Sequence, residues 1–251
     1  MPGKCIDILY RLVVDADTQQ EFRVRIDSTT LQHQVPAVEA PPEWTSLGNH
    51  RCTHCPLDRA LNEHCPAALS LVSLMELSNE LLSYTEVDAF VETPERTFSK
   101  RCSTQKALSS LVGLCMATSG CPSMSLLKPM ARFHLPFATR EETIYRAASS
   151  YLLAQFFLHR KGQTQDLELE EFQAAYDRIH EVNMSMASRL RSISLGDASI
   201  NALVLLDLFA HSMPLAAEGK LGTLRYLYED FLRSGADGGS AVDPPSSHAN
   251  L

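Results

Sequence analysis

The sequence has no run of lysines or arginines, and its 22 basic residues are outnumbered by 30 acidic ones, which gives a formal net charge of −8. A chain with this charge repels polyanions, and it lacks the basic stripe that is the electrostatic footprint of nucleic-acid-binding domains. We therefore expect no nucleic acid among its partners.

Long apolar runs are also missing. The N-terminus carries one basic residue, Lys4, and Asp7 interrupts the apolar residues that follow, so no signal peptide is predicted. Later apolar stretches are cut by charge or proline before they reach the roughly 20 residues that cross a bilayer. Seven cysteines, an odd number, then favour a reducing compartment where thiols bind metal more readily than they pair. We expect a cytoplasmic protein without a membrane span.

The remaining composition is typical of a globular protein: 45% of the residues are hydrophobic and 21% are charged. A chain of 251 residues can bury a large core. We expect one compact domain over residues 1–233, with a β-hairpin and helix half at 1–120 and a helical half at 121–233. Residues 234–251 are rich in Gly, Ser and Pro and are expected to form a disordered tail.

Alternating apolar residues predict the strands. Residues 6–14 and 22–26 alternate with a period of two and are separated by a short polar segment, which predicts an antiparallel hairpin with one exposed face. Residues 87–91 and 96–102 predict a second hairpin. Together they indicate two small antiparallel hairpins.

Helices are predicted after each hairpin. Residues 65–82 give a helix of about four turns with Pro66 at its first position, where the missing N–H costs nothing. Residues 108–119 give another, which ends before Gly120 because glycine readily adopts the left-handed conformation at a helix end. The predicted order of the first half is therefore β-β-α-β-β-α.

Four helices are predicted in the C-terminal half. The first begins at a capping box formed by Thr139 and Glu142 and runs to Arg160. The second, residues 169–193, spaces its apolar residues alternately by three and four, which favours packing inside a bundle over an intermolecular coiled coil.

The third and fourth helices complete the predicted fold. Residues 197–213 are apolar on most sides and should form a central, buried helix that Pro214 stops. Residues 221–231 should form the last helix. The sequence thus predicts an α+β protein in which a four-helix half packs on the hairpins.

A cysteine-rich segment is the clearest functional signal. Cys52-x-x-Cys55 places two sulfur atoms on one turn, and Cys65 follows at the predicted start of a helix, where a thiolate is favoured. The fourth ligand is expected to be Cys121, because Cys55, Cys65 and Cys121 are all followed by proline. The alternative fourth ligands are histidines: His50, His54, His64 and His134.

This set predicts a metal site that binds zinc or an iron–sulfur cluster, and the sequence does not choose between them. The competing interpretation treats these cysteines as small buried hydrophobic residues. For Cys5, Cys102 and Cys115 that second interpretation is preferred, because they lie in or beside predicted strands and an apolar helix.

A second dense segment, residues 116–137, lies in a predicted loop. Lys128, Arg132 and His134, with Arg140 near the positive end of the next helix, could bind a small carboxylate or phosphate. The simpler interpretation is that the cations pair with acidic residues. A third is that Cys121 and His134 form a thiolate–imidazolium nucleophile, which requires the two to lie within hydrogen-bond reach.

Two pairs of an aspartate and a histidine, three and four residues apart, occur on the predicted C-terminal helices. Asp177-x-x-His180 and Asp207-x-x-x-His211 each place an acid and a histidine on one helix face. The further glutamates of a di-iron bundle are missing, so we interpret them as structural pairs.

The motif-bearing segments resemble a bacterial family of unknown function. The resemblance is carried by MATSGCP at residues 116–122, ARFHLPFAT at 131–139 and EETIYR at 141–146, with CTHCPL at 52–57. It implies a bacterial, uncharacterised protein and supplies no activity. We expect a binding or regulatory role built on the metal site. The alternatives are a thiol-dependent enzyme that uses Cys121 with His134, or a helical interaction scaffold, in a monomer or homodimer.

Overall fold

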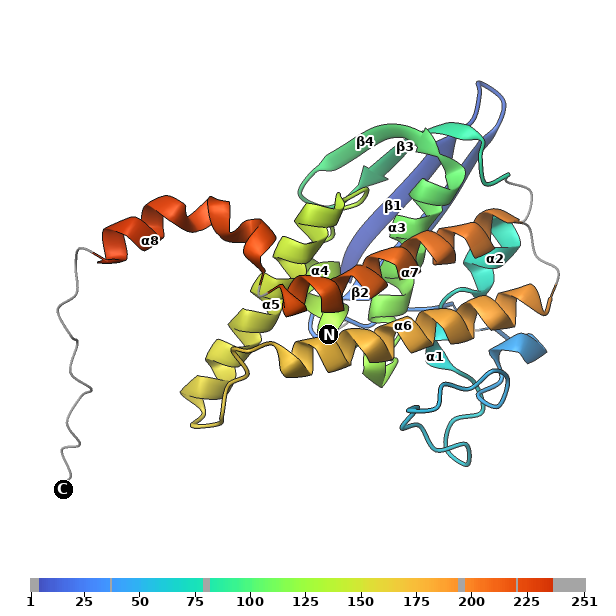
Figure 1. The fold of residues 1–251 in the computed structure, drawn as a ribbon. Helices are drawn as coiled ribbons and strands as arrows, with labels where there is room; N and C mark the ends of the chain where they lie inside the picture. The colour runs from blue at the N-terminus through green and yellow to red at the C-terminus, as the bar shows by residue number, and fades with distance from the viewer. Residues whose placement is uncertain (1–4, 37, 79–81, 194–196, 220, 237–251) are drawn as a thin grey trace.

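The computed structural model describes residues 5–36, 38–78, 82–193, 197–219 and 221–236. Its centre is one antiparallel sheet with the strand order β2-β1-β3-β4 (Figure 1). The strands are β1 (Cys5–Val13), β2 (Gln19–Asp27), β3 (Glu86–Glu92) and β4 (Thr97–Ser103). The α+β prediction is confirmed.

The two predicted hairpins are present but form a single sheet, because β1 pairs with β3 as well as with β2. Tyr10 lies opposite Phe22 on one side and Val91 on the other, and all three side chains are buried. The period-two pattern identified the buried face, but it contains no information about which strands are neighbours. The two hairpins therefore belong to one four-stranded sheet, a pairing that the sequence did not predict.

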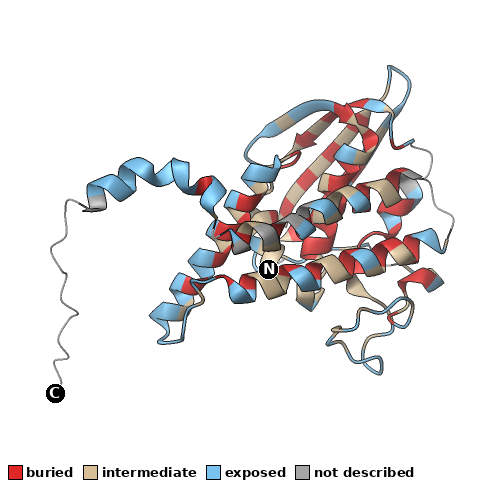
Figure 2. Cartoon of the chain, viewed as in Figure 1, coloured by how far each residue is buried: buried red, intermediate tan, exposed pale blue. Residues whose placement is uncertain are grey.

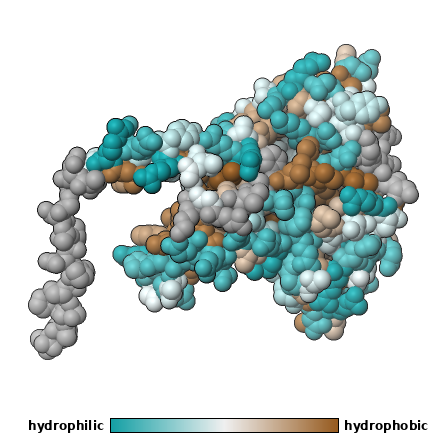
Figure 3. All heavy atoms as spheres, in the orientation of Figure 1, coloured by the Kyte–Doolittle hydropathy of each residue, from teal (hydrophilic) through white to brown (hydrophobic). Residues whose placement is uncertain are grey.

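The helix α3 (Thr104–Thr118) lies between the sheet and the helix α7 (Asp197–Glu218), as Figures 1 and 2 show. Most of its residues are buried, whereas Val204 and Leu208 of α7 are 41% and 62% exposed. Figure 3 shows apolar surface along α7. The central buried helix is thus α3, where the sequence had predicted residues 197–213, because an apolar composition does not specify the depth of a helix.

Two further helix boundaries were predicted incorrectly. Residues 65–82 form two short helices, α1 (Pro66–Leu69) and α2 (Val72–Ser78), and the Ser70 hydroxyl bonds to the Ala67 carbonyl at the break. Pro214 lies inside α7, which continues because Met213 and Ala217 on either side are buried. The first helix of the predicted order β-β-α-β-β-α is thus two short helices, so this order is not confirmed in detail.

The other helices frame the core. They are α5 (Arg140–Arg160), α6 (Glu170–Arg191) and the short α4 (Lys128–Arg132), with 3-10 turns η1 (Glu43–Thr45) and η2 (Pro122–Leu127). The capping box of α5 is confirmed: Thr139 Oγ1 accepts from the Glu142 amide at 3.2 Å, and Glu142 Oε2 accepts from the Thr139 amide at 2.7 Å. Gly120 takes the positive φ of 90° that the sequence predicted for the turn after α3.

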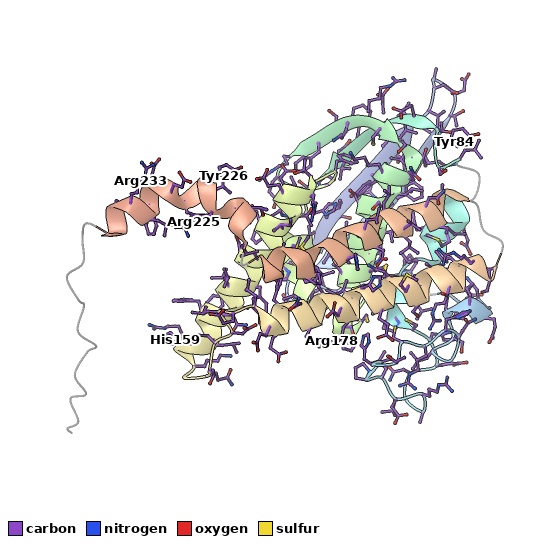
Figure 4. All side chains as sticks on the ribbon, viewed as in Figure 1. Tyr84, His159, Arg178, Arg225, Tyr226 and Arg233 are labelled. Carbon is purple, nitrogen blue, oxygen red and sulfur yellow. The ribbon has the colours of Figure 1, made fainter. Side chains whose placement is uncertain are left out.

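The predicted fourth packed helix is instead an arm formed by η3 (Gly222–Tyr228) and α8 (Glu229–Ala236). It extends away from the body in Figure 1, and Phe231 is 75% exposed. Figure 4 labels Arg225, Tyr226 and Arg233 on this arm. Residues 234–236 continue α8, and the rest of the predicted tail, 237–251, lies outside the described residues.

No single helix of the described residues is long and apolar enough to cross a membrane. The pair formed by residues 104–118 and 122–132 reaches that length only together, and it is bent by 116°.

The capping box gives a direct test of the fold. Thr139→Ala should lower the free energy of unfolding by about 1 kcal/mol, because the Glu142 amide loses its acceptor. Thr139→Ser keeps the hydroxyl and should stay close to the parent protein in urea denaturation. Equal stability of the alanine and serine variants would contradict this assignment.

Candidate functional site

The cysteine-rich segment lies beside α6, and Figure 1 draws it below that helix. Its first two sulfur atoms are held by a turn in which the Cys55 amide donates to the Cys52 carbonyl at 3.2 Å. The Arg51 guanidinium donates to the Cys55 and Leu57 carbonyls at 3.0 and 2.7 Å. Arg51 therefore fixes the chain on both sides of Pro56.

Cys65 and Cys121 each precede a helical turn. Cys65 is the N-cap of α1, and its amide donates to the Thr45 carbonyl at 2.8 Å. Cys121 is the N-cap of η2, and its amide donates to Ser119 Oγ at 3.2 Å. The proline after each cysteine occupies the first position of the turn, where it needs no hydrogen-bond acceptor. The recurring Cys-Pro pair is thus a helix-start signal as well as a ligand signal.

The structure brings the four predicted cysteines into one region. The Cys52 thiol interacts electrostatically with Cys65 and Cys55, and the Cys121 thiol interacts with Cys65 and Cys52. Burial raises the pKa of Cys52, and it raises that of Cys121 to about 11. The Cys52 and Cys121 thiols are therefore protonated at neutral pH.

Three residues of α6, spaced by four, hold this segment and were not predicted from the sequence. Glu181 accepts from the Thr53 amide and hydroxyl at 2.5 and 2.6 Å, and it also bonds His54 Nδ1 at 2.5 Å. The bonds from Thr53, above all from its hydroxyl, lower the pKa of Glu181 to about 2. Ser185 Oγ donates to the His50 carbonyl.

Arg189 is the third member of this row and the largest fully buried side chain, at 1% exposure. Its Nη1 atom donates to the carbonyls of Trp44 and Ser46 at 2.8 and 2.7 Å, whereas its Nε has no hydrogen-bond partner. Burial lowers its pKa, and neighbouring cysteine thiols oppose that shift. Those thiols belong to Cys65, Cys52 and Cys55. No carboxylate among the described residues forms an ion pair with this guanidinium, and the ionisable groups that interact with it electrostatically are these thiols.

The thiols are close but are not in ligating positions. Within the part of the chain that the structure describes, no group of three or more His, Cys, Asp or Glu side chains is arranged so that it could hold a metal ion. None of the seven cysteines forms a disulfide, and Cys102 and Cys115 are buried.

The alternative histidine ligands are engaged elsewhere. His54 uses both ring nitrogens, one with Glu181 and the other with Ser123 Oγ at 3.1 Å. His64 Nδ1 lies 2.8 Å from Thr45 Oγ1. Among the candidate fourth ligands, Cys121 is the one that interacts electrostatically with the other predicted thiol ligands, Cys65 and Cys52.

The predicted anion-binding set is only partly brought together. Arg132 and His134 line one cavity of about 280 Å³, but Lys128 does not line it and instead donates to the Thr30 carbonyl at 3.2 Å. Arg132 Nη1 lies 3.6 Å from Glu95 Oε1, so this cation pairs with an acidic residue, as the simpler interpretation of the sequence had it. Arg140 is exposed at the start of α5.

Cys121 and His134 do not form the pair that a thiol nucleophile requires. His134 Nε2 lies 2.5 Å from the hydroxyl of Tyr10, and the Tyr10 side chain is fully buried. The electrostatic partners of Cys121 are thiols. Sequence spacing could not test this, because the two residues belong to different turns of an irregular segment.

Two further sequence pairings are replaced by contacts between helices. His180 Nδ1 bonds Asp207 Oδ1 at 2.8 Å, so the acid of one predicted pair joins the histidine of the other. The His180 and His211 rings lie 5.4 Å apart. The apolar seam of α6 is likewise buried within the chain, where α6 packs against α7, η1 and η2, and is not available as a scaffold between chains. Its central members are Phe172, Tyr176, Ile179, Asn183, Met186 and Leu190.

With this geometry established, comparison with known families gives the class of the protein. Residues 8–229 match the model of a domain of unknown function, DUF6901, and the chain belongs to that family. No curated protein matches the chain. No solved structure matches it either. The predicted resemblance to an uncharacterised family is confirmed.

The buried guanidinium gives a prediction for stability. Arg189→Met should lower the free energy of unfolding by about 3 kcal/mol, because the Trp44 and Ser46 carbonyls lose their donor in a buried position. The matched control is Arg191→Met, an exposed arginine two residues further along α6, which should change stability by less than about 0.5 kcal/mol. Urea denaturation measures both. Similar losses in the two variants would contradict the role given to Arg189.

The burial of His134, beside Tyr10, predicts that the free energy of unfolding depends on pH. Burial, with a smaller effect of Arg146, lowers the pKa of His134 from 6.5 to about 3. As the pH falls below 6.5, His134 becomes protonated in the unfolded chain, whereas in the folded chain it stays neutral until about pH 3. The free energy of unfolding therefore decreases as the pH falls through this range. The slope from this group is at most about 1.4 kcal/mol per pH unit.

His134→Gln should therefore flatten the decline in stability between pH 6.5 and 5, measured by urea denaturation at each pH. His159→Gln is the control, because His159 is exposed near the end of α5 (Figure 4). A decline as steep in the His134 variant as in the parent would exclude this residue as its source.

Proposed function

We propose that Cys52, Cys55, Cys65 and Cys121 bind a soft metal, as a zinc ion or an iron–sulfur cluster, and that the site has a binding or regulatory role. The observation that carries the proposal is Arg189: a fully buried cation whose Nε is unpartnered and whose ionisable neighbours are thiols. A buried charge requires an opposite charge nearby. Thiolates are the groups placed to supply it.

A metal would explain why the four thiols lie near one another, three of them interacting electrostatically with one guanidinium. Four thiolates carry four negative charges, of which Arg189 compensates one, and the remaining repulsion in a partly buried site calls for a further cation. Thiolate sulfur is a preferred ligand of zinc, at about 2.3 Å, and of iron–sulfur clusters. Both metals remain candidates, because each accepts four cysteine ligands.

Binding would draw the four sulfur atoms into ligating positions. Residues 48–65 contain no helix or strand, so the turn at Cys52 and Cys55 can move relative to α1 and η2. The anchors at Glu181, Ser185 and Arg189 lie on a rigid helix and limit that movement. Metal binding would thereby tie the cysteine-rich segment to the helical part of the chain.

The chemistry also suggests where the protein works. Thiols that lie close together pair as disulfides in an oxidising compartment unless a metal binds them. We therefore place the protein in a reducing compartment, with the cytoplasm as the default.

The test is elemental analysis of untagged protein purified without oxygen, together with its visible spectrum. About one zinc per chain without a visible band would identify an ion, and iron with acid-labile sulfide and a visible band would identify a cluster. Protein without metal, with all seven thiols freely titratable and no uptake of added zinc, would refute the proposal.

Single variants sharpen this measurement. Cys52→Ser and Cys121→Ser should each lower metal content severalfold and lower the melting temperature with it, because binding free energy is part of folding free energy. Cys102→Ala is the matched control, since this cysteine lies at the end of β4, outside the cluster. A metal content that fell equally in the control would not support the assigned ligands.

A further inference from the structure

A second cavity lies away from the thiols, between α3, α4, α6 and α7. Its volume is about 160 Å³ and its lining is mainly apolar. Members of that lining include Leu114, Met124, Met130, Ile179, Leu206 and Met213. An apolar cavity of about 150 Å³ engineered in another protein holds a benzene molecule, so this one has room for a substituted ring.

One wall of the cavity carries a polar atom without a partner. Asn183 is 1% exposed, it lines the cavity, and its Oδ1 accepts no hydrogen bond. Its Nδ2 donates to Asp207 Oδ1 at 3.3 Å, which fixes the orientation of the amide because a carboxylate cannot accept from Oδ1. An unsatisfied buried acceptor costs about 1–3 kcal/mol, and a ligand that donates to it would recover this energy.

One residue at the boundary of the cavity, Arg146, carries a positive charge. His134, Leu135 and Arg146 line both this cavity and the one of about 280 Å³ that contains Arg132, whereas Asn183 lines only the first. Arg146 Nη2 donates to the Met130 and Phe133 carbonyls at 2.8 and 2.7 Å. These bonds position the guanidinium but do not neutralise it. Glu142 interacts with it electrostatically, but no carboxylate among the described residues forms an ion pair with it.

We infer that this cavity binds a small carboxylic acid with an apolar, ring-sized body, whose hydroxyl or N–H group donates to Asn183 Oδ1 and whose carboxylate faces Arg146. The mainly apolar lining matches the body of such a molecule. This site is independent of the thiol cluster, so ligand binding is expected with or without metal.

The test compares four probes that differ by one group: 4-hydroxybenzoate, benzoate, phenol and toluene. Binding is measured by calorimetry and by amide shifts in two-dimensional NMR. We expect 4-hydroxybenzoate to bind most tightly, and benzoate and phenol each to bind about tenfold more weakly, because each lacks one polar partner. Toluene should bind most weakly of the four.

Variants then assign the contacts. Asn183→Leu removes the acceptor at similar volume and should weaken 4-hydroxybenzoate about tenfold while leaving benzoate unchanged. Arg146→Lys should weaken both carboxylates and leave phenol unchanged. Ala210→Leu fills the cavity from α7 and should abolish binding of every probe. Circular dichroism verifies that each variant is folded.

Three results would overturn the inference. One is the absence of saturable binding of all four probes at millimolar concentration. Another is binding that persists in folded Ala210→Leu, which would place the probes on the surface. The third is equal weakening of benzoate and 4-hydroxybenzoate by Asn183→Leu, which would remove the hydrogen bond from the argument.

Discussion

The buried guanidinium of Arg189 is the constraint on which the candidate metal site depends. It joins the C-terminal part of α6 to the carbonyls of Trp44 and Ser46, more than 140 residues away in the sequence. A guanidinium presents several N–H donors in a fixed plane, so it can hold two carbonyls and still direct Nε elsewhere. Among the described residues, α6 also bonds the chain before Cys52 through Ser185, but that bond to the His50 carbonyl is exposed.

Glu181 and Ser185 extend this anchoring along the same helix row. Residues spaced by four lie above one another on a helix, so three polar side chains of α6 meet three successive parts of the cysteine-rich segment. Because the segment has little regular structure, its backbone N–H and carbonyl groups need such partners. The turn that carries Cys52 and Cys55 is thus positioned by side chains of a distant helix rather than by its own fold.

Local chemistry could be predicted from the sequence, and pairing between distant segments could not. The capping box at Thr139, the turn at Gly120 and the strand alternation around Tyr10 each depend on residues a few positions apart. The β1–β3 pairing depends on a choice between equivalent hydrogen-bonding edges, which alternation does not encode. Apolar composition similarly failed to distinguish the depth of α3 from that of α7.

The candidate site likewise contains residues that the sequence predicted and residues that it did not. The motif identified the four cysteines that converge, but the role of Arg189 was missed although the sequence contained a signal for it. Arg189 follows Val182 by seven residues, so it lies on a helix face that is otherwise buried, and a charge on such a face calls for a partner. The cavity at Asn183 had a comparable signal, an amide within an apolar seam, which we interpreted only as part of the helix packing.

Both proposed sites meet on α6. Asn183 lines the cavity on one face of this helix, and Glu181, Ser185 and Arg189 hold the cysteine-rich segment on another. Proximity alone does not couple two sites, because a rigid helix in a single position transmits nothing. Coupling would require α6 to have two positions with different energies for metal and ligand, and the effect would then be equal in both directions. The contacts of α6 with α7 and with the cysteine-rich segment are the interactions that such a movement would have to change.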